Sequence, residues 1–328
     1  MDTAQEYDLT DLDRLCIHAE DVSVETWQGR RALKLVSGLV LLPSVSLSDA
    51  RIDVRIGADK AAYPGIAFRA LDRMNYELAY AQPHTSGQWD ALQYDPVFHG
   101  SNTWQLYRGL PFQAETLVPT GEWFDFRLEF KDRRAWMLVN DQPPLVIEEL
   151  AHSQSQELFG LWTYLPAYFC DLRVSPCAAL PPGVGHAPIT PAGAITEWFL
   201  DGYGVVACEP GGVLNLNRFL PTSVGEARLT RQFELLSAET ITLSFGFSDE
   251  LVLSLDDKAI FEGRTLFSGF ADYASRGYVE PDAHTLQHAL TPGIHTLSAV
   301  LRVTESFGWG LILSVQGNHL GWPPACVL

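Results

Sequence analysis

The chain has 328 residues, of which 47% are hydrophobic and 19% are charged, and its formal net charge is −18. This length predicts two domains, each large enough to bury its own core. The negative charge argues against nucleic acid or an anionic membrane as a partner. No stretch approaches the roughly 20 apolar residues of a membrane-spanning helix.

The N-terminal residues are acidic and do not have the form of a secretory signal. The five cysteines include no Cys-x-x-Cys pair, which is typical of reduced, mostly structural thiols. We therefore expect a cytoplasmic protein without a membrane partner. The sequence leaves the oligomeric state open.

Short strand-like runs separated by turn signals fill the first half of the chain. The clearest run lies at 123–130, where apolar residues from Phe124 to Phe130 alternate with aromatic and charged residues from Trp123 to Glu129. This period of two predicts a half-buried strand in a curved sheet that presents a mixed aromatic and charged face. The other predicted strands here are 32–36, 50–56, 65–70, 76–81, 104–108, 135–139, 158–164 and 168–174.

Residues 175–193 contain five prolines and three glycines, which excludes a helix or a central strand and predicts a linker. Strand-like runs then resume at 213–216, 227–235, 240–247, 251–255, 258–261, 293–303 and 309–315. Only 4–14 and 281–290 are predicted as short helices. The expected fold is all-β, with two β-sandwich (jelly-roll) domains at 1–176 and 195–328 joined by the Pro/Gly-rich linker 177–194.

Six segments of the first domain carry a family resemblance: 50–56, 64–69, 75–78, 121–128, 139–141 and 168–174. Through them the domain resembles a concanavalin A-like (laminin-G-like) jelly roll, in particular the bacterial domain named for 3-keto-disaccharide hydrolases. Segments 247–263 and 290–297 make residues 195–318 similar to a galactose-binding-like jelly roll. These resemblances imply lectin-like folds that host many functions.

Segment 76–107 combines aromatic residues with Asp, His, Gln and Asn. Aromatic rings stack on the C–H faces of sugars, and planar polar groups bind their hydroxyls. We expect the ligand-binding residues of this segment to be Trp89, Asp90, Tyr94, Trp104 and Tyr107. The alternative is that many of these rings form part of the core.

Three residues are candidates for catalysis on the same concave face. Glu77 or His99 is expected to act as the base and Arg69 as the group that stabilises an oxyanion. Arg69 and Glu77 lie on neighbouring predicted strands, so a cross-strand ion pair is the structural alternative.

One metal ligand is suggested by resemblance alone. Asp171 resembles a position that helps to bind structural calcium in many jelly rolls, although calcium needs six or more oxygen ligands and the others cannot be named. Apart from this possible calcium ion, no cofactor is expected.

The sequence thus predicts a protein that recognises a carbohydrate or another small molecule on the concave face of domain 1. The alternative is a glycoside-active lyase or hydrolase that uses the same face, possibly on 3-keto-glycosides. A biosynthetic enzyme that holds an apolar intermediate, or an assembly module with a large apolar patch, also remains open.

Overall fold

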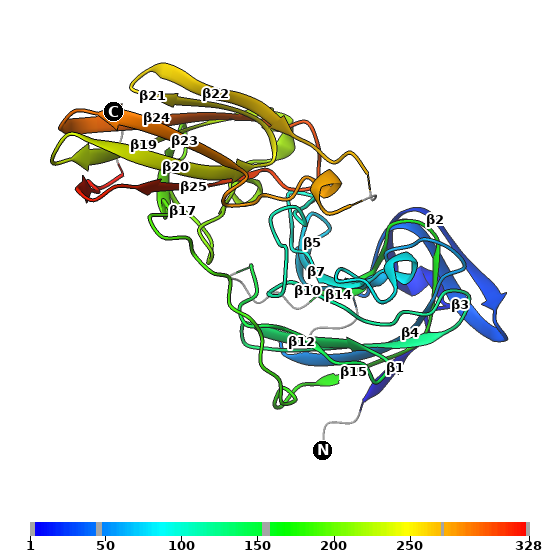
Figure 1. The fold of residues 1–328 in the computed structure, drawn as a ribbon. Coiled ribbons are helices and arrows are strands. Elements are labelled where there is room, and N and C mark those ends of the chain that lie inside the picture. Colours follow the sequence, from blue (N-terminus) through cyan, green and yellow to red (C-terminus); the bar gives the residue numbers. More distant parts are fainter. Residues whose placement is uncertain (1–3, 44–47, 153–157, 270–271, 326–328) are drawn as a thin grey trace. The chain divides into compact units, whose positions relative to one another are not determined.

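The computed structural model describes residues 4–43, 48–152, 158–269 and 272–325. Its regular elements are β-strands and short 3-10 helices, which confirms the all-β prediction (Figure 1). Within the described ranges, no helix has the length and apolarity needed to cross a membrane. The 3-10 helices are η1 (Leu12–Arg14), η2 (Pro83–Thr85), η3 (Leu216–Arg218), η4 (Thr222–Val224) and η5 (Ala274–Arg276).

The two predicted helices are wrong. The first contains a strand, β1 (Gln5–Tyr7), followed by a single 3-10 turn, and the second contains the strand β23 (His284–Leu290). Along β23 the side chains alternate between half-buried and exposed positions. This period of two is that of a strand, and it outweighs the local helix propensity.

The described chain forms two compact units. Unit 1 consists of Met1–Gly100 and Tyr107–His186, and unit 2 consists of Ser101–Leu106 and Ala187–Leu328. The boundary at His186 lies within the predicted linker. Segment Ser101–Leu106 lies far from the rest of unit 2 in the sequence, so its place there depends on long-range contacts that sequence patterns do not show.

The strands of unit 1 form one antiparallel sheet in the order β10-β7-β6-β5-β14-β3-β15-β4-β11-β12-β13, with β1 added to β15 and β2 added to β3. Besides β1, they are β2 (Cys16–Trp27), β3 (Arg30–Leu41), β4 (Ala50–Gly57), β5 (Gly65–Asp72), β6 (Asn75–Ala81), β7 (Leu92–Tyr94), β8 (Val97–Phe98), β10 (Gln113–Ala114), β11 (Phe124–Lys131), β12 (Arg134–Val139), β13 (Leu145–Ile147), β14 (Leu158–Thr163) and β15 (Ala167–Pro176).

This sheet folds back on itself, so that strands far apart in its order pack against each other. Phe68 of β5 and Phe130 of β11 are not on neighbouring strands, yet their ring centroids lie 5.0 Å apart and both side chains are buried. Each fully buried Phe contributes about 1.5–3 kcal/mol to the hydrophobic stabilisation. The predicted alternation holds over most of β11: Phe124, Phe126, Leu128 and Phe130 are buried, and Asp125 and Arg127 are more exposed. Glu129 is the exception, since it is also buried.

Unit 2 is a sandwich of two antiparallel sheets around a separate core, which contains Trp198, Phe233, Phe245, Leu253 and Trp309. One sheet has the order β17-β16-β19-β24-β21-β22 with β26 added to β19, and the other has the order β18-β25-β20-β23. The strands of these two sheets, besides β23, are β16 (Glu197–Leu200), β17 (Gly204–Ala207), β18 (Leu214–Asn215), β19 (Glu226–Leu235), β20 (Glu239–Phe247), β21 (Asp249–Leu255), β22 (Lys258–Thr265), β24 (Gly293–Arg302), β25 (Gly310–Gln316) and β26 (Leu320–Gly321). The short strand β9 (Ser101–Asn102) also falls in unit 2 but belongs to neither of these sheets.

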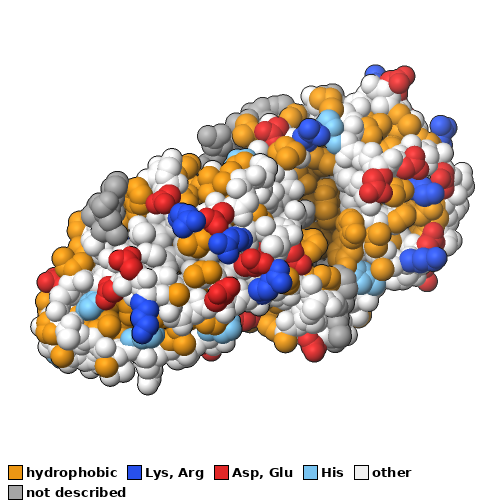
Figure 2. All heavy atoms as spheres, turned by 90° about the horizontal axis from the view of Figure 1, so that it is seen from above, with side chains coloured by type: hydrophobic (Ala, Val, Ile, Leu, Met, Phe, Trp, Pro, Cys, Tyr) orange, Lys and Arg blue, Asp and Glu red, His pale blue; other side chains and the backbone are white. Residues whose placement is uncertain are grey.

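The surface carries charges of both signs. Figure 2 shows acidic and basic side chains interspersed over the face that it presents. Interspersed charges of both signs do not create a field of one sign over that face. The net charge of −18 is therefore not concentrated there.

Candidate functional site

The outer face of unit 1 carries charged residues of alternating sign on neighbouring strands. The register places Arg55 of β4 opposite Asp125 of β11. In the next row along β4, Asp53 lies opposite Arg127 on β11 and opposite Arg173 on β15. We call this surface the charge checkerboard, and its members are Glu6, Arg51, Asp53, Arg55, Asp125, Arg127, Asp171 and Arg173.

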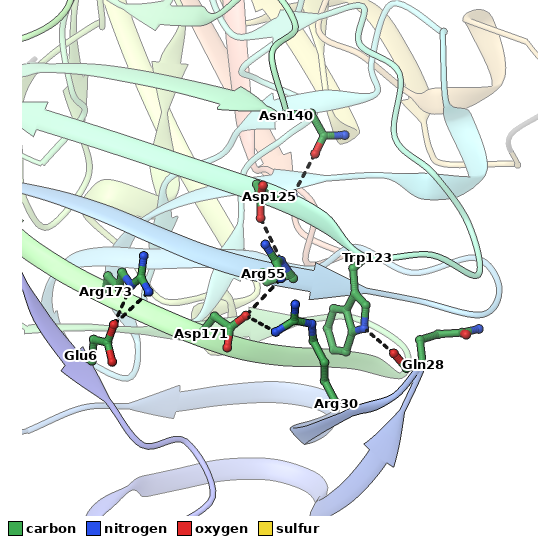
Figure 3. Close-up of polar contacts among 9 residues, drawn as sticks. All are labelled: Glu6, Gln28, Arg30, Arg55, Trp123, Asp125, Asn140, Asp171 and Arg173. Atoms are coloured by element: carbon green, nitrogen blue, oxygen red, sulfur yellow. Dashed lines mark hydrogen bonds and ion pairs between the residues drawn. The ribbon is translucent and has the colours of Figure 1, made fainter.

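Arg55 lies at the centre of one row of the checkerboard. Its Nε donates to Asp125 Oδ1 at 3.0 Å, and its Nη1 lies 3.2 Å from Asp171 Oδ2 (Figure 3). Arg30 of β3 donates to the same Asp171 oxygen at 2.9 Å. One guanidinium group thus joins carboxylates of two strands, which fixes the positions of donors and acceptors on the face.

The second row is centred on Asp53. Arg51 and Arg127 each donate from Nε to this carboxylate at 2.7 Å. Burial acts to raise the pKa of Asp53, but the hydrogen bonds from the two arginines outweigh it, so the pKa lies below its usual value. At the end of this row, Arg173 donates from Nε to Glu6 at 2.9 Å.

Every member of the checkerboard except Glu6 lines a hollow of about 510 Å³. A second hollow, of about 360 Å³, is lined by residues of β1 and β15 and shares Asp171 and Arg173 with the first. Their volumes lie in the range of small-molecule sites. The first hollow is lined by Ala4, Arg51, Asp53, Val54, Arg55, Asp125, Arg127, Asp171, Arg173 and Ser175.

An aromatic group lies at one end of the checkerboard. Trp123 is half-buried and precedes Asp125 by two residues, so it shares the outer face (Figure 3). Its indole N–H donates to the Gln28 carbonyl at 3.3 Å. Trp27 meets the Trp123 ring edge-on at 4.6 Å, and Tyr168 stacks on Trp27 at 4.8 Å. These contacts fix the orientation of the Trp123 ring.

The structure places the predicted catalytic residues Glu77 and Arg69 inside unit 1. Glu77 is 0% exposed; it accepts hydrogen bonds from the Tyr94 hydroxyl at 2.6 Å and from the His152 N–H at 2.8 Å. Arg69 is also buried, and its guanidinium carbon lies 5.7 Å from the centroid of the Phe130 ring. Burial lowers the pKa of Arg69, while Glu77 and Asp49 act to raise it. These contacts are those of a buried polar cluster.

Arg69 faces the core because of the backbone. A register irregularity separates Phe68 from Asp72 in the pairing of β5 with β6, and Arg69 has φ of 47°. The irregularity breaks the strict alternation that the predicted strand 65–70 assumes.

The other predicted residues of segment 76–107 that lie in unit 1 differ in exposure. Trp89 is 36% exposed and His99 is half-buried, with its N–H donating to Asn75 Oδ1 at 3.0 Å. Asp90 is buried, as are Tyr94 and Tyr107, whose ring centroids lie 5.9 Å apart. Their assignment as ligand-binding residues stays a prediction.

Trp104 lies in unit 2, whereas the sequence assigned it to the first domain. Its ring contacts Phe267, Tyr278 and Phe307. The structure therefore does not place Trp104 with Trp89 and Tyr94 in one unit.

Asp171, the predicted calcium ligand, belongs to the checkerboard. Two guanidinium groups surround one of its oxygens, which does not suit calcium because that ion prefers six or more oxygen ligands. Among the described residues, no group of three or more His, Cys, Asp or Glu is placed to hold a metal ion.

Sequence reasoning missed Arg55 and Arg51 as functional candidates. The signal was present, because apolar residues alternate with charged residues along 50–56 as they do along 123–130. What the sequence does not contain is the register that pairs these two distant strands.

No family model matches the sequence, and no curated protein matches it. Among solved structures, the carbohydrate-binding module CBM66 from Bacillus subtilis is 15% identical, covers 47% of this chain and 92% of its own, and has a TM-score of 0.36. A putative glycosyl hydrolase from Parabacteroides distasonis is 10% identical, with 52% and 98% coverage and a TM-score of 0.36. A protein with a galectin-like fold from Bacillus subtilis is 8% identical, with 53% and 98% coverage and a TM-score of 0.39. At these TM-scores the similarities carry no argument about function.

Proposed function

We propose that unit 1 binds an uncharged carbohydrate across the charge checkerboard. The observation that carries this proposal is the hollow of about 510 Å³ lined by arginines and aspartates of three neighbouring strands. Adjacent strands lie about 4.8 Å apart, so donors and acceptors repeat across the face at the scale of a sugar ring.

The chemistry of the checkerboard matches that of sugar hydroxyls. Each hydroxyl both donates and accepts a hydrogen bond. Guanidinium groups supply donors in a planar fork, and carboxylates supply acceptors beside them. The four arginines and four carboxylates of the checkerboard balance in charge, which favours an uncharged ligand.

Trp123 supplies an apolar surface next to these groups. The C–H face of a sugar ring stacks on an aromatic ring while its hydroxyls reach polar neighbours. Because Trp27 and the Gln28 carbonyl hold the indole in place, stacking costs little conformational entropy.

The pairing of these carboxylates with arginines favours a binding role over cleavage of a glycosidic bond. The pKa of Asp53 is held down by Arg51 and Arg127, and Asp125 and Asp171 are both bound by Arg55. A glycosidase of the usual kind needs one carboxylic acid with a raised pKa to protonate the leaving group. Burial raises the pKa of Glu129, which lies opposite Arg51 but does not line the hollow. The arginine-paired carboxylates that do line it suit recognition.

A glycan array followed by calorimetry tests the proposal. We expect the protein to bind an uncharged glycan and Arg55→Met to weaken this binding at least about tenfold, as loss of a central contact does. Arg134→Met is the matched control, because Arg134, on β12, pairs with Glu148 and does not line the hollow. Trp123→Ala should also weaken binding. Absence of any glycan ligand, or equal affinity of Arg55→Met and Arg134→Met, would contradict the proposal.

A further inference from the structure

Six residues of unit 2 come from the middle of the unit 1 sequence. We call Ser101–Leu106 the inserted segment, because the residues on both sides of it belong to unit 1. Within it, the Leu106 N–H donates to the Thr103 carbonyl at 2.9 Å, which closes a β-turn of sequence Thr-Trp-Gln-Leu. Trp104 and Gln105 occupy the two central positions of this turn.

Unit 2 holds the backbone of this turn from two sides. The Gln105 N–H donates to the Phe307 carbonyl at 3.0 Å, and the Val279 N–H donates to the Gln105 carbonyl at 3.0 Å. Two distant parts of unit 2 thus pair with one residue of the segment. Main-chain bonds of this kind are how proteins bind peptides whose side chains then decide specificity.

The Trp104 ring lies within a cluster of three aromatic rings. Its centroid is 5.9 Å from that of Phe267, 5.5 Å from that of Tyr278 and 5.5 Å from that of Phe307. The first two contacts are edge-to-face, with interplanar angles of 88° and 87°. Trp104 is half-buried, and a Trp whose ring packs among aromatic neighbours is a typical anchor of a recognition site.

The side chain of Gln105 is bound by a backbone carbonyl group, in a space that exists because the neighbouring residue 277 is a glycine. Its side chain is 0% exposed, and Nε2 donates to the Arg276 carbonyl at 3.1 Å. A Cβ on Gly277 would lie 2.7 Å from this Nε2, and Gly277 has φ of 72°. A glycine at 277 is therefore needed both for the turn of the backbone and for the space that the amide occupies.

Leu106 is accommodated in the same way. A Cβ on Gly308 would lie 3.0 Å from Leu106 Cγ. Three consecutive side chains of the turn thus meet an aromatic cluster, a carbonyl acceptor and a glycine. Unit 2 thus contacts each of the three side chains, Trp104, Gln105 and Leu106, through a different group.

We propose that unit 2 carries a peptide-recognition pocket for a Trp-Gln β-turn, which the inserted segment fills in cis. This pocket is independent of the carbohydrate site proposed for unit 1. A tethered segment has an effective concentration on the order of millimolar, so a free peptide at micromolar concentration does not displace it. The same pocket accepts a turn of this sequence in trans once the inserted segment no longer occupies it.

The test uses the full chain with Thr103–Leu106 replaced by Gly-Ser-Gly-Ser. A fluorescent cyclic peptide of residues 99–110, closed to favour the turn, is titrated while its anisotropy is measured. We expect binding to this variant and none to the unchanged protein at micromolar concentration. A peptide with Trp104→Ala should bind at least about tenfold more weakly. The chain with Arg134→Met is the control, because Arg134 lies in unit 1 outside both proposed sites, and it should exclude the peptide as the unchanged protein does.

Absence of peptide binding by a cooperatively folded replacement variant would overturn the proposal, as would equal binding to the unchanged protein. If the replacement prevents folding, the second test is to measure amide hydrogen-exchange rates in the full chain with Trp104→Ala. We then expect the Gln105 and Val279 amides to exchange at least about tenfold faster, while the Phe126 amide in unit 1 keeps its rate. Unchanged protection of Gln105 and Val279 would equally refute the inference.

Discussion

Replacing Glu77 by Gln should destabilise unit 1 strongly, although it changes one oxygen to an NH₂ group. One oxygen of Glu77 accepts from the Tyr94 hydroxyl and the other from the His152 N–H, and the side chain is fully buried. The new NH₂ group cannot accept a hydrogen bond. If this NH₂ group donated to the Tyr94 oxygen, which already accepts from the Ala151 N–H at 2.8 Å, the Tyr94 O–H would lose the acceptor that Glu77 provides.

The expected loss is about 3–5 kcal/mol, the usual cost of removing one partner from a buried charged network. It includes about 1–3 kcal/mol for each buried group left without a hydrogen bond. Arg69 adds to the loss, because it is buried and Glu77 helps to compensate its charge. In a unit of this size, 1 kcal/mol shifts Tm by about 2–4 °C, so Tm should fall by roughly 10 °C.

Thermal unfolding followed by circular dichroism measures this shift. Glu149→Gln is the matched control, because Glu149 is 56% exposed and pairs only at the surface with Arg133. Its effect should stay below about 1 kcal/mol. A Tm for Glu77→Gln within about 2 °C of the unchanged protein would refute the structural role. It would also favour the catalytic role predicted from the sequence.

Two further predictions concern other parts of the fold. Burial acts to lower the pKa of His295, but hydrogen bonds to Asp256 and the Thr291 carbonyl outweigh it, so the pKa lies above 6.5. Protonation therefore stabilises unit 2: the contribution is complete below pH 6.5 and is lost as pH rises through the folded-state pKa. In thermal unfolding scans, His295→Gln should therefore lower Tm more at about pH 5.5 than at about pH 8.5. An equal decrease in Tm at the two pH values would contradict this prediction. Gly65→Ala should cost about 1–3 kcal/mol, since its Cβ would lie 2.0 Å from the Ala79 carbonyl oxygen; an unchanged Tm would show that β5 and β6 separate easily.

The fold class could be predicted because it depends on local patterns. The alternation from Phe124 to Phe130 specifies which side of β11 faces the core, whatever its neighbours are. The same rule applied to His284–Leu290 would have replaced the predicted helix with a strand.

The candidate site depends on contacts that no local pattern contains. Arg55 and Asp125 are 70 residues apart in the sequence, and only the register of β4 with β11 brings them together. Composition drew attention to Tyr94 and Trp104 as candidate ligand-binding residues. It does not reveal that Tyr94 lies in the interior of unit 1 or that Trp104 belongs to unit 2.

The most direct test of the carbohydrate proposal is an NMR titration that observes the arginine Nε–Hε signals. An uncharged glycan identified on the array would be added to the labelled protein. We predict that the signals of Arg51, Arg55, Arg127 and Arg173 shift and saturate together, while that of Arg134 stays in place. Binding of the glycan without movement of these four signals, or with movement of Arg134 alone, would contradict the site proposed for unit 1.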